Sequence, residues 1–288
     1  MALGNLASRF LVAVVAVPIL LLALYQRNPV YTWALIFAAS LVAMAELFAM
    51  TLADKTDRAV SLGLGALAVA AFYWMHPLAL PQHGAWLQLA DSSHTVLGLA
   101  VIAPMLYYLF RYGDLTTVAT RMAFTVFGII YAGLLLTTAA ELKRDGGAVG
   151  GDLVLFVLAV VWAGDTGAYF AGRFLGKRKL YPAVSPKKTW AGAFGGLAGS
   201  FVAGATMKVL RLDGIFNWVD VAVLAIAGGA LGQMGDLAES LLKRAQGVKD
   251  SGSILPGHGG ILDRIDAVLF FAPFVHVYIQ LRLWTSAL

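Results

Sequence analysis

The sequence predicts an all-α protein, a polytopic bundle of about nine transmembrane helices. Three observations support this fold class. Hydrophobic residues make up 60% of the 288 positions and charged residues only 13%, whereas soluble domains carry about 25% charged residues. The mean hydropathy is +0.78. The apolar residues also gather in runs of about 20, the length that a helix needs to cross a bilayer.

Each apolar run is a candidate membrane span. The first follows a short basic start and has no convincing small-residue cleavage site, so it is expected to be a helix and not a signal peptide. The third run ends at a His-Pro pair, and the eighth continues past its apolar part into acidic and basic residues. The expected helices cover roughly 9–26, 29–50, 59–80, 93–111, 119–142, 152–173, 190–209, 218–242 and 264–284.

The distribution of basic residues predicts the orientation, because lysine and arginine favour cytosolic loops. With the N-terminus in the cytosol and nine alternating helices, 15 of the 21 lysines and arginines lie on the cytosolic side. We therefore expect an N-in, C-out topology. We also expect two regions, with N-terminal transmembrane helices over 1–150 and, over 151–288, C-terminal helices that carry the functional site on the cytosolic side.

The composition excludes some kinds of function. There is no cysteine, so disulfides, thiolate zinc sites and cysteine nucleophiles are impossible. The net charge is +5. In such an apolar chain this charge reflects the preference of lysine and arginine for cytosolic loops, together with an anionic substrate. No nucleic-acid partner is therefore expected.

The sixth expected helix contains a carboxylate inside an apolar run. Such a group is costly in a membrane unless it faces protein, water or a cation. Asp165, Tyr169 and Arg173 recur every four residues and therefore share one helix face. We expect Asp165 to contact a metal or a nucleotide. The alternative is a structural pairing with Arg173 or a lysine.

The loop before the seventh expected helix has the features of an anion site. Ser185 or Thr189 would cap the helix, and Pro186 suits its first turn. A helix start with free N–H groups, a hydroxyl and the pair Lys187 and Lys188 favours phosphate binding. The alternative is that these lysines only follow the cytosolic bias of membrane loops.

The stretch from 235 to 266 concentrates charge and glycine in an otherwise apolar chain. Its carboxylates are suited to a divalent metal, its cations to phosphate oxygens, and its glycines allow the backbone to approach a ligand. Together they indicate phosphoryl or nucleotidyl transfer. The carboxylates are Asp236, Glu239, Asp263 and Asp266, and the cations are Lys243, Arg244, Lys249 and Arg264.

Three segments carry a resemblance to a known family. The pattern Ser240-x-x-Lys243-Arg244 through His258-Gly259-Gly260-x-x-Asp263-Arg264-x-Asp266 resembles the signature of the phosphatidate cytidylyltransferases, or CDP-diacylglycerol synthases. The segments Ser185–Thr189 and Asp165–Tyr169 are similar to two further blocks of that family. Residues 1–150 resemble it only as hydrophobic helices.

The resemblance implies a magnesium-dependent reaction of CTP with phosphatidate in a bacterial inner membrane, with the active site facing the cytosol. One or two divalent ions would bind Asp236, Asp263 and Asp266. Further catalytic roles would fall to Lys243 and His258, although a loop histidine is as often only a hydrogen-bond partner. Contacts to the nucleotide and its phosphates are expected from Ser185, Lys187, Lys188, Arg244, Lys249 and Asp165.

Other interpretations remain open at this point. A secondary transporter of an anionic solute would also use an intramembrane carboxylate and glycine-rich helices. A CTP-dependent polyprenol kinase would share the phosphate chemistry. A phosphatidyl transferase is disfavoured because its Asp-Gly-x-x-Ala-Arg run is absent. The small-residue helices make a homodimer plausible, and Glu46, near the end of the second expected helix, is expected to be a structural partner.

Overall fold

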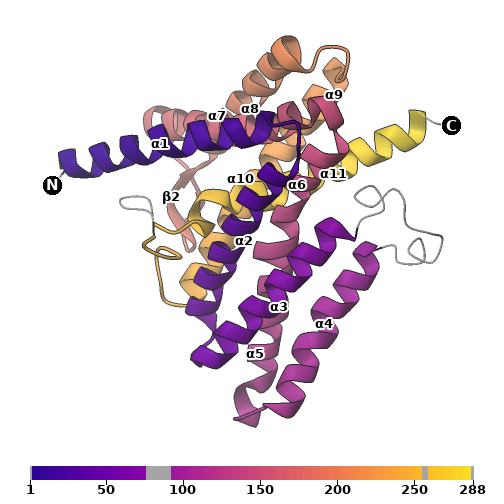
Figure 1. Cartoon of the computed structure of the whole chain (residues 1–288). Coiled ribbons are helices and arrows are strands. Elements are labelled where there is room, and N and C mark those ends of the chain that lie inside the picture. Colours follow the sequence, from indigo (N-terminus) through magenta and orange to yellow (C-terminus); the bar gives the residue numbers. More distant parts are fainter. Residues whose placement is uncertain (1, 76–91, 255–258, 287–288) are drawn as a thin grey trace. The chain divides into compact units, whose positions relative to one another are not determined.

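The computed structural model describes residues 2–75, 92–254 and 259–286 (Figure 1). Helices account for 82% of it. By its internal contacts the chain forms two compact units. Unit 1 comprises residues 1–145 and 250–263, and unit 2 comprises residues 146–249 and 264–288.

Unit 1 is built from the N-terminal helices. The π-helical segment η1 joins α5 to α6 without a break, so the three form one continuous helical stretch from Leu115 to Asp145. The unit contains α1 (Ala2–Tyr25), α2 (Val30–Thr51), α3 (Lys55–Trp74), α4 (Ser92–Phe110), α5 (Leu115–Gly128), η1 (Ile129–Leu134) and α6 (Leu135–Asp145).

Unit 2 contains the C-terminal helices and a small hairpin. A π-helical segment, η3, again joins two α-helices, so that α9, η3 and α10 run on from one another. The elements are η2 (Gly147–Val149), α7 (Gly150–Leu175), β1 (Lys179–Tyr181), β2 (Ser185–Thr189), α8 (Trp190–Arg211), α9 (Trp218–Ala222), η3 (Val223–Ala227), α10 (Gly228–Ala245) and α11, which begins at Leu262 in unit 1 and continues to Ser286.

Glycines let the helices of unit 1 pack closely around α2. A Cβ added at Gly128 would run into the ring of Phe48, and one at Gly133 would lie 2.9 Å from Val69 and 3.1 Å from the sulfur of Met44. Phe48 and Met44 are both fully buried. Where lipid surrounds the helices, hydrophobic burial gives them little reason to associate, and close approach at small residues supplies packing energy instead.

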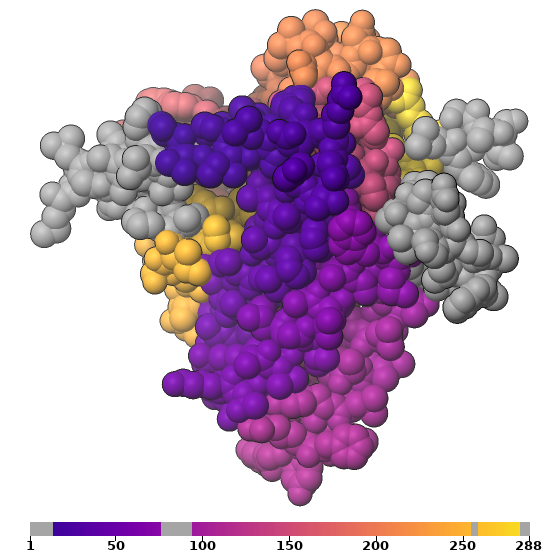
Figure 2. All heavy atoms as spheres, viewed as in Figure 1, coloured from indigo at the N-terminus to yellow at the C-terminus, as the bar shows by residue number. Residues whose placement is uncertain are grey.

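The side chains of α2, α3 and α4 lie side by side in the space-filling view (Figure 2).

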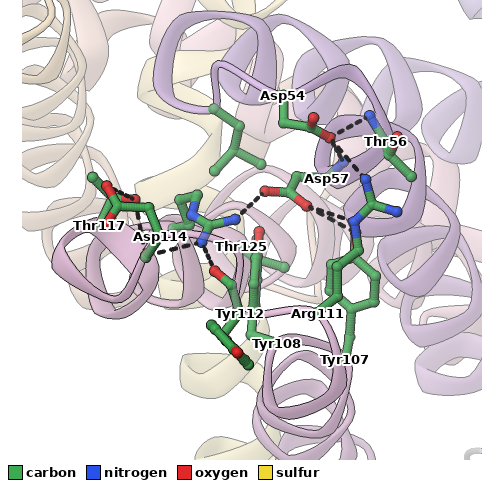
Figure 3. Close-up of polar contacts among 12 residues, drawn as sticks. Asp54, Thr56, Asp57, Tyr107, Tyr108, Arg111, Tyr112, Asp114, Thr117 and Thr125 are labelled. Atoms are coloured by element: carbon green, nitrogen blue, oxygen red, sulfur yellow. Dashed lines mark hydrogen bonds and ion pairs between the residues drawn. The ribbon is translucent and has the colours of Figure 1, made fainter.

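A buried carboxylate ties together the ends of α3, α4 and α5 in unit 1 (Figure 3). Asp57 accepts hydrogen bonds from Tyr107 Oη and Arg121 Nη1, both at 2.8 Å, and Arg111 lies 3.9 Å away. Asp54 caps α3 by accepting from two backbone N–H groups. The N–H of Asp57, more than any other group, lowers the pKa of the Asp54 carboxyl. This end of the unit is thus fixed by charge-assisted bonds.

Unit 2 is organised by the contact between α7 and α8, its most extensive helix–helix contact. A Cβ added at Gly167 would overlap the carbonyl oxygen of Gly195 on α8, and one at Gly199 would overlap that of Ala163 on α7. Ser200 Oγ donates to the carbonyl oxygen of Val160 at 3.0 Å and links the same helices. The close packing that the glycine-rich sequence predicts for 190–209 is therefore present.

The start of α8 differs in part from the sequence prediction. Thr189 is the N-cap, and its Oγ1 accepts from the N–H of Gly192 at 3.1 Å. Ser185 and Pro186 do not belong to the helix, because residues 185–189 form β2 and pair antiparallel with β1. Pro186 is thus not in the first turn of α8, and this two-stranded hairpin departs from a purely helical fold.

Helices occupy each of the nine ranges predicted as spans, within the residues that the structure describes. In the part of the chain that the structure describes, five stretches are long and apolar enough to cross a membrane, namely Val30–Thr51, Leu115–Asp145, Gly147–Leu175, Trp190–Arg211 and Trp218–Ala245. Two shorter apolar helices are Val14–Tyr25 and His94–Phe110. The count of about nine spans and the N-in orientation stay predictions.

The α7–α8 contact gives a stability prediction. Gly167→Ala places a methyl group against the backbone of α8, and such overpacking costs about 1–3 kcal/mol. We expect the thermal unfolding midpoint in detergent to fall by about 5 °C. The matched control is Gly63→Ala in α3, where nothing lies within 4 Å of the added Cβ. Equal midpoints for the two variants would contradict the close α7–α8 contact.

Candidate active site

A cavity of about 350 Å³ lies within unit 2, between α7, α8, α10 and the hairpin. Several predicted site residues meet there although they come from separate stretches of the sequence. Its polar lining includes Asp165, Tyr169, Arg173, Lys187, Lys188 and Asp236. Two lysines, one arginine and two carboxylates therefore line one hollow, and such cations can form charge-assisted hydrogen bonds with anionic groups.

The hairpin and α10 place an ion pair at the cavity. Lys188 Nζ lies 2.7 Å from Asp236 Oδ2, and their side chains are 25% and 34% exposed. The Nζ atom itself is buried, and the pairing holds the Lys188 ammonium against Asp236 at the cavity wall. The neighbouring Lys187 also lines the cavity.

The polar face of α7 contributes the opposite side. Asp165, Tyr169 and Arg173 all line the cavity, as their four-residue spacing predicts. Arg173 Nη1 donates to Tyr169 Oη at 2.6 Å. The Arg173 guanidinium therefore has a hydrogen-bond partner other than Asp165. The sequence had offered a pairing of Asp165 with Arg173 as the structural alternative.

The glycines of α10 set the path of the helix that carries Asp236. A Cβ at Gly232 would lie 3.5 Å from Ala267 on α11, and one at Gly235 would lie 2.6 Å from the carbonyl oxygen of Asp266. Because α11 approaches so closely, Asp266 lies beside the residue that precedes Asp236. Asp266 is half-buried, and its Oδ1 accepts from the N–H of Ala267 at 2.8 Å.

The basic residues near the end of α10 have partners close in sequence. Lys243 is buried and pairs with the buried carboxylate of Glu239 one turn earlier. Arg244 Nη1 donates to the carbonyl oxygen of Val248 at 2.9 Å, and Lys249 is exposed. The roles in transfer and phosphate binding that the sequence suggests for these three cations stay predictions, as does that of Ser185.

A second acidic centre lies in unit 1, where the glycine-rich segment meets the first turn of α11. Asp263 Oδ2 accepts hydrogen bonds from the N–H groups of Ser251 at 3.0 Å and Gly260 at 2.8 Å. Gly259 has a φ of +81°, a conformation that side chains disfavour. The predicted catalytic residue His258 lies outside the described residues.

Glu46 is a residue of this centre that the sequence did not connect to it. It is buried, with 5% exposure, and its carboxylate accepts three hydrogen bonds from the segment around Asp263. The sequence did show a carboxylate near the end of an apolar helix. Such a group needs hydrogen-bond donors when it is buried. The sequence did not reveal which donors it would find.

Comparison with known proteins decides the class. The model of the cytidylyltransferase family matches residues 7–282. The chain belongs to the cytidylyltransferase family. A nucleotidyltransferase needs cations for a triphosphate and carboxylates for its metal, and residues of both kinds line the cavity of unit 2.

Similar proteins are found in several bacteria. The chain is 36% identical to a phosphatidate cytidylyltransferase of Bacillus subtilis over 248 residues, which cover 86% of this chain and 88% of that protein. Proteins of the same name from Staphylococcus saprophyticus and Brucella suis are 43% and 44% identical over 155 and 151 residues. These matches cover 54% and 52% of this chain, and they span little more than half of each relative, 58% and 55%.

Proposed function

We propose that this cytidylyltransferase transfers CMP from CTP to phosphatidate, giving CDP-diacylglycerol and pyrophosphate. The observation that carries the proposal is the unit 2 cavity, where cations of the hairpin and of α7 meet carboxylates of α7 and α10, two helices in apolar stretches of membrane-spanning length. This combination suits one water-soluble, highly charged substrate and one lipid substrate. The names of the relatives support phosphatidate as the acceptor.

The reaction needs positioning more than covalent chemistry. A phosphate oxygen of phosphatidate attacks the α-phosphorus of CTP, a new P–O bond forms, and the bond from that phosphorus to the β-phosphate bridging oxygen breaks. Pyrophosphate leaves with the electron pair. The nucleophile is already an anion at neutral pH, so no strong general base is required. Charge neutralisation and alignment supply most of the rate enhancement.

The cations of the cavity would neutralise the triphosphate. Lys187 and Lys188 follow one another on β2, next to the N-terminus of α8, whose backbone dipole also favours anions. Asp236 holds the Lys188 ammonium in place. We assign Lys187 and Lys188 to the phosphates of CTP, and Arg173 to the same charged region.

The acidic residues of the cavity fit a magnesium ion. Mg²⁺ prefers oxygen ligands and is often held by one or two carboxylates together with substrate phosphates. Asp165 and Asp236 both line the cavity. Within the described residues, no three acidic or histidine side chains are grouped closely enough to bind an ion on their own. We therefore assign Asp165 and Asp236 as protein ligands here, and keep Asp263 and Asp266 as further predicted ligands.

When bound, Mg²⁺ would neutralise phosphate charge during transfer. The chain's own residues would bind CTP, orient its triphosphate and hold the acceptor phosphate. The excess of basic loop residues on one side supports an active site that faces the cytosol of a bacterial inner membrane. Because CTP is a cytosolic metabolite, this orientation would give the site direct access to it.

The decisive test is turnover of the purified protein in detergent micelles with labelled CTP, phosphatidate and Mg²⁺. We expect label to enter the lipid fraction, and we expect EDTA to abolish transfer until Mg²⁺ is restored. Transfer of phosphate to a polyprenol, with none of CMP to phosphatidate, would instead establish a kinase. Folded protein that is inactive with every lipid acceptor would refute the proposal and favour the transporter.

Lys188→Ala is expected to raise the apparent KM for CTP about tenfold or more, because a charge-assisted phosphate contact is lost. The control is Arg178→Ala, a basic residue of the same loop whose guanidinium lies over the ring of Trp190. Steady-state kinetics at varied CTP compares the two variants. Small and equal effects would mean that the basic loop serves only membrane topology.

Asp263→Asn is expected to lower kcat at least about 100-fold while the protein still folds and inserts. The N–H groups of Ser251 and Gly260 both donate to Asp263 Oδ2, so an asparagine oxygen can keep these two bonds while the charge is removed. Asp213→Asn is the control, since Asp213 is exposed and pairs with Lys208. Near-normal turnover of Asp263→Asn at saturating Mg²⁺ would exclude Asp263 as a metal ligand.

A further inference from the structure

Glu46 on α2 binds the glycine-rich segment before α11 and the first residue of α11 itself. Its Oε2 accepts from Ser251 Oγ at 3.0 Å and from the N–H of Leu262 at 2.9 Å. Its Oε1 accepts from the N–H of Ile261 at 3.0 Å. All of these residues belong to unit 1, and the carboxylate is buried. One side chain therefore holds both ends of the segment from 251 to 262.

The glycines of the segment leave room for this carboxylate. A Cβ added at Gly252 would lie 2.5 Å from Glu46 Oε1 and 2.8 Å from its carboxyl carbon. A Cβ added at Gly260 would overlap Glu46 Oε2 and Ser251 Oγ. Neither glycine has a positive φ. Space for the Glu46 side chain, and not backbone conformation, therefore explains glycine at these two positions.

Glu46 and Asp263 accept hydrogen bonds from neighbouring donors of the same segment. Ser251 donates its hydroxyl to Glu46 and its N–H to Asp263. The N–H of Gly260 donates to Asp263, and the next two N–H groups along the chain donate to Glu46. The two carboxylates thus divide consecutive donors between them. A change in one set of bonds must move the donors of the other.

We propose that Glu46 is a positioning residue for nucleotidyl transfer, acting through Ser251, residues 260–262 and the orientation of Asp263. This inference rests on the proposed function. Hydrophobic burial would hold the segment without fixing its direction, because it is non-directional. Three hydrogen bonds to one buried carboxylate fix the direction of three donors. Glu46 itself does not touch substrate in this proposal.

The test uses Glu46→Gln, which keeps the shape of the side chain. Its single oxygen can serve the two donors at Oε2, but its amide group then meets the N–H of Ile261, and two donors face each other. Hydrogen–deuterium exchange of the full-length protein in detergent reports on peptides covering 259–266. We expect exchange of the Ile261 amide to quicken about 10–100-fold, the range for a lost bond to a charged acceptor, while the Leu262 amide keeps its bond and changes less.

The same variant is assayed for CMP transfer. We expect kcat to fall about 10–100-fold while the KM for CTP changes less than about threefold, because the lysines of β2 are untouched. The control is Glu141→Gln, another buried glutamate of unit 1, which pairs with Arg144 at 3.3 Å. Glu141→Gln is expected to lower stability without changing the exchange of 259–266 or kcat per folded molecule.

If Glu46→Gln does not fold, Ser251→Ala is measured in its place. The Ser251→Ala substitution removes one hydrogen bond to Glu46 and leaves the two backbone donors. We expect a kcat loss of about 3–10-fold with faster exchange of 259–266. Wild-type exchange of the segment, or wild-type kcat despite faster exchange, would overturn the positioning role. Failure of the proposed function is distinct, because the wild-type protein would then transfer no CMP to phosphatidate.

Discussion

The structure depends on how a mostly apolar chain satisfies the few carboxylates it buries. A carboxylate removed from water is tolerated only when donors or cations surround it. Asp57 meets this demand with a tyrosine and two arginines, and Glu46 meets it with a serine and two backbone N–H groups. In both cases the donors come from other elements of unit 1. Each buried charge therefore joins segments that are distant in sequence and fixes their geometry.

Small residues play the complementary part. Between helices in lipid, hydrophobic burial gives little drive, so close van der Waals packing must supply it. Gly167, Gly195 and Gly199 bring α7 and α8 into backbone contact, and Gly235 brings α10 against α11. This packing sets the positions of Asp165 and Asp236, which lie on α7 and α10 beside the cavity. Glycines that contact no ligand thus determine the spacing of the groups that we expect to do so.

The sequence predicted what depends on local pattern and missed what depends on distant partners. Apolar run lengths located the helices. The residue types before α8 left Ser185 and Thr189 as alternative caps, and the structure selects Thr189. The spacing on α7 predicted that Asp165, Tyr169 and Arg173 share a face. The partner of Glu46 was not predictable, because Ser251 is 205 residues away. The hairpin was missed because Ser185 and Pro186 also suit a helix start.

The family motif has a second structural role that follows from the path of the chain. The chain leaves unit 2 after Lys249, contributes 250–263 to unit 1, and returns to unit 2 at Arg264. The chain therefore passes from one unit to the other twice within the stretch from 235 to 266 that carries the family motif. Three of its glycines serve the fold of unit 1, with a φ of +81° at Gly259 and close approach to Glu46 at Gly252 and Gly260. A glycine in this motif is thus required for packing even where it touches no substrate, and a loss of activity on its substitution is not by itself proof of a catalytic role.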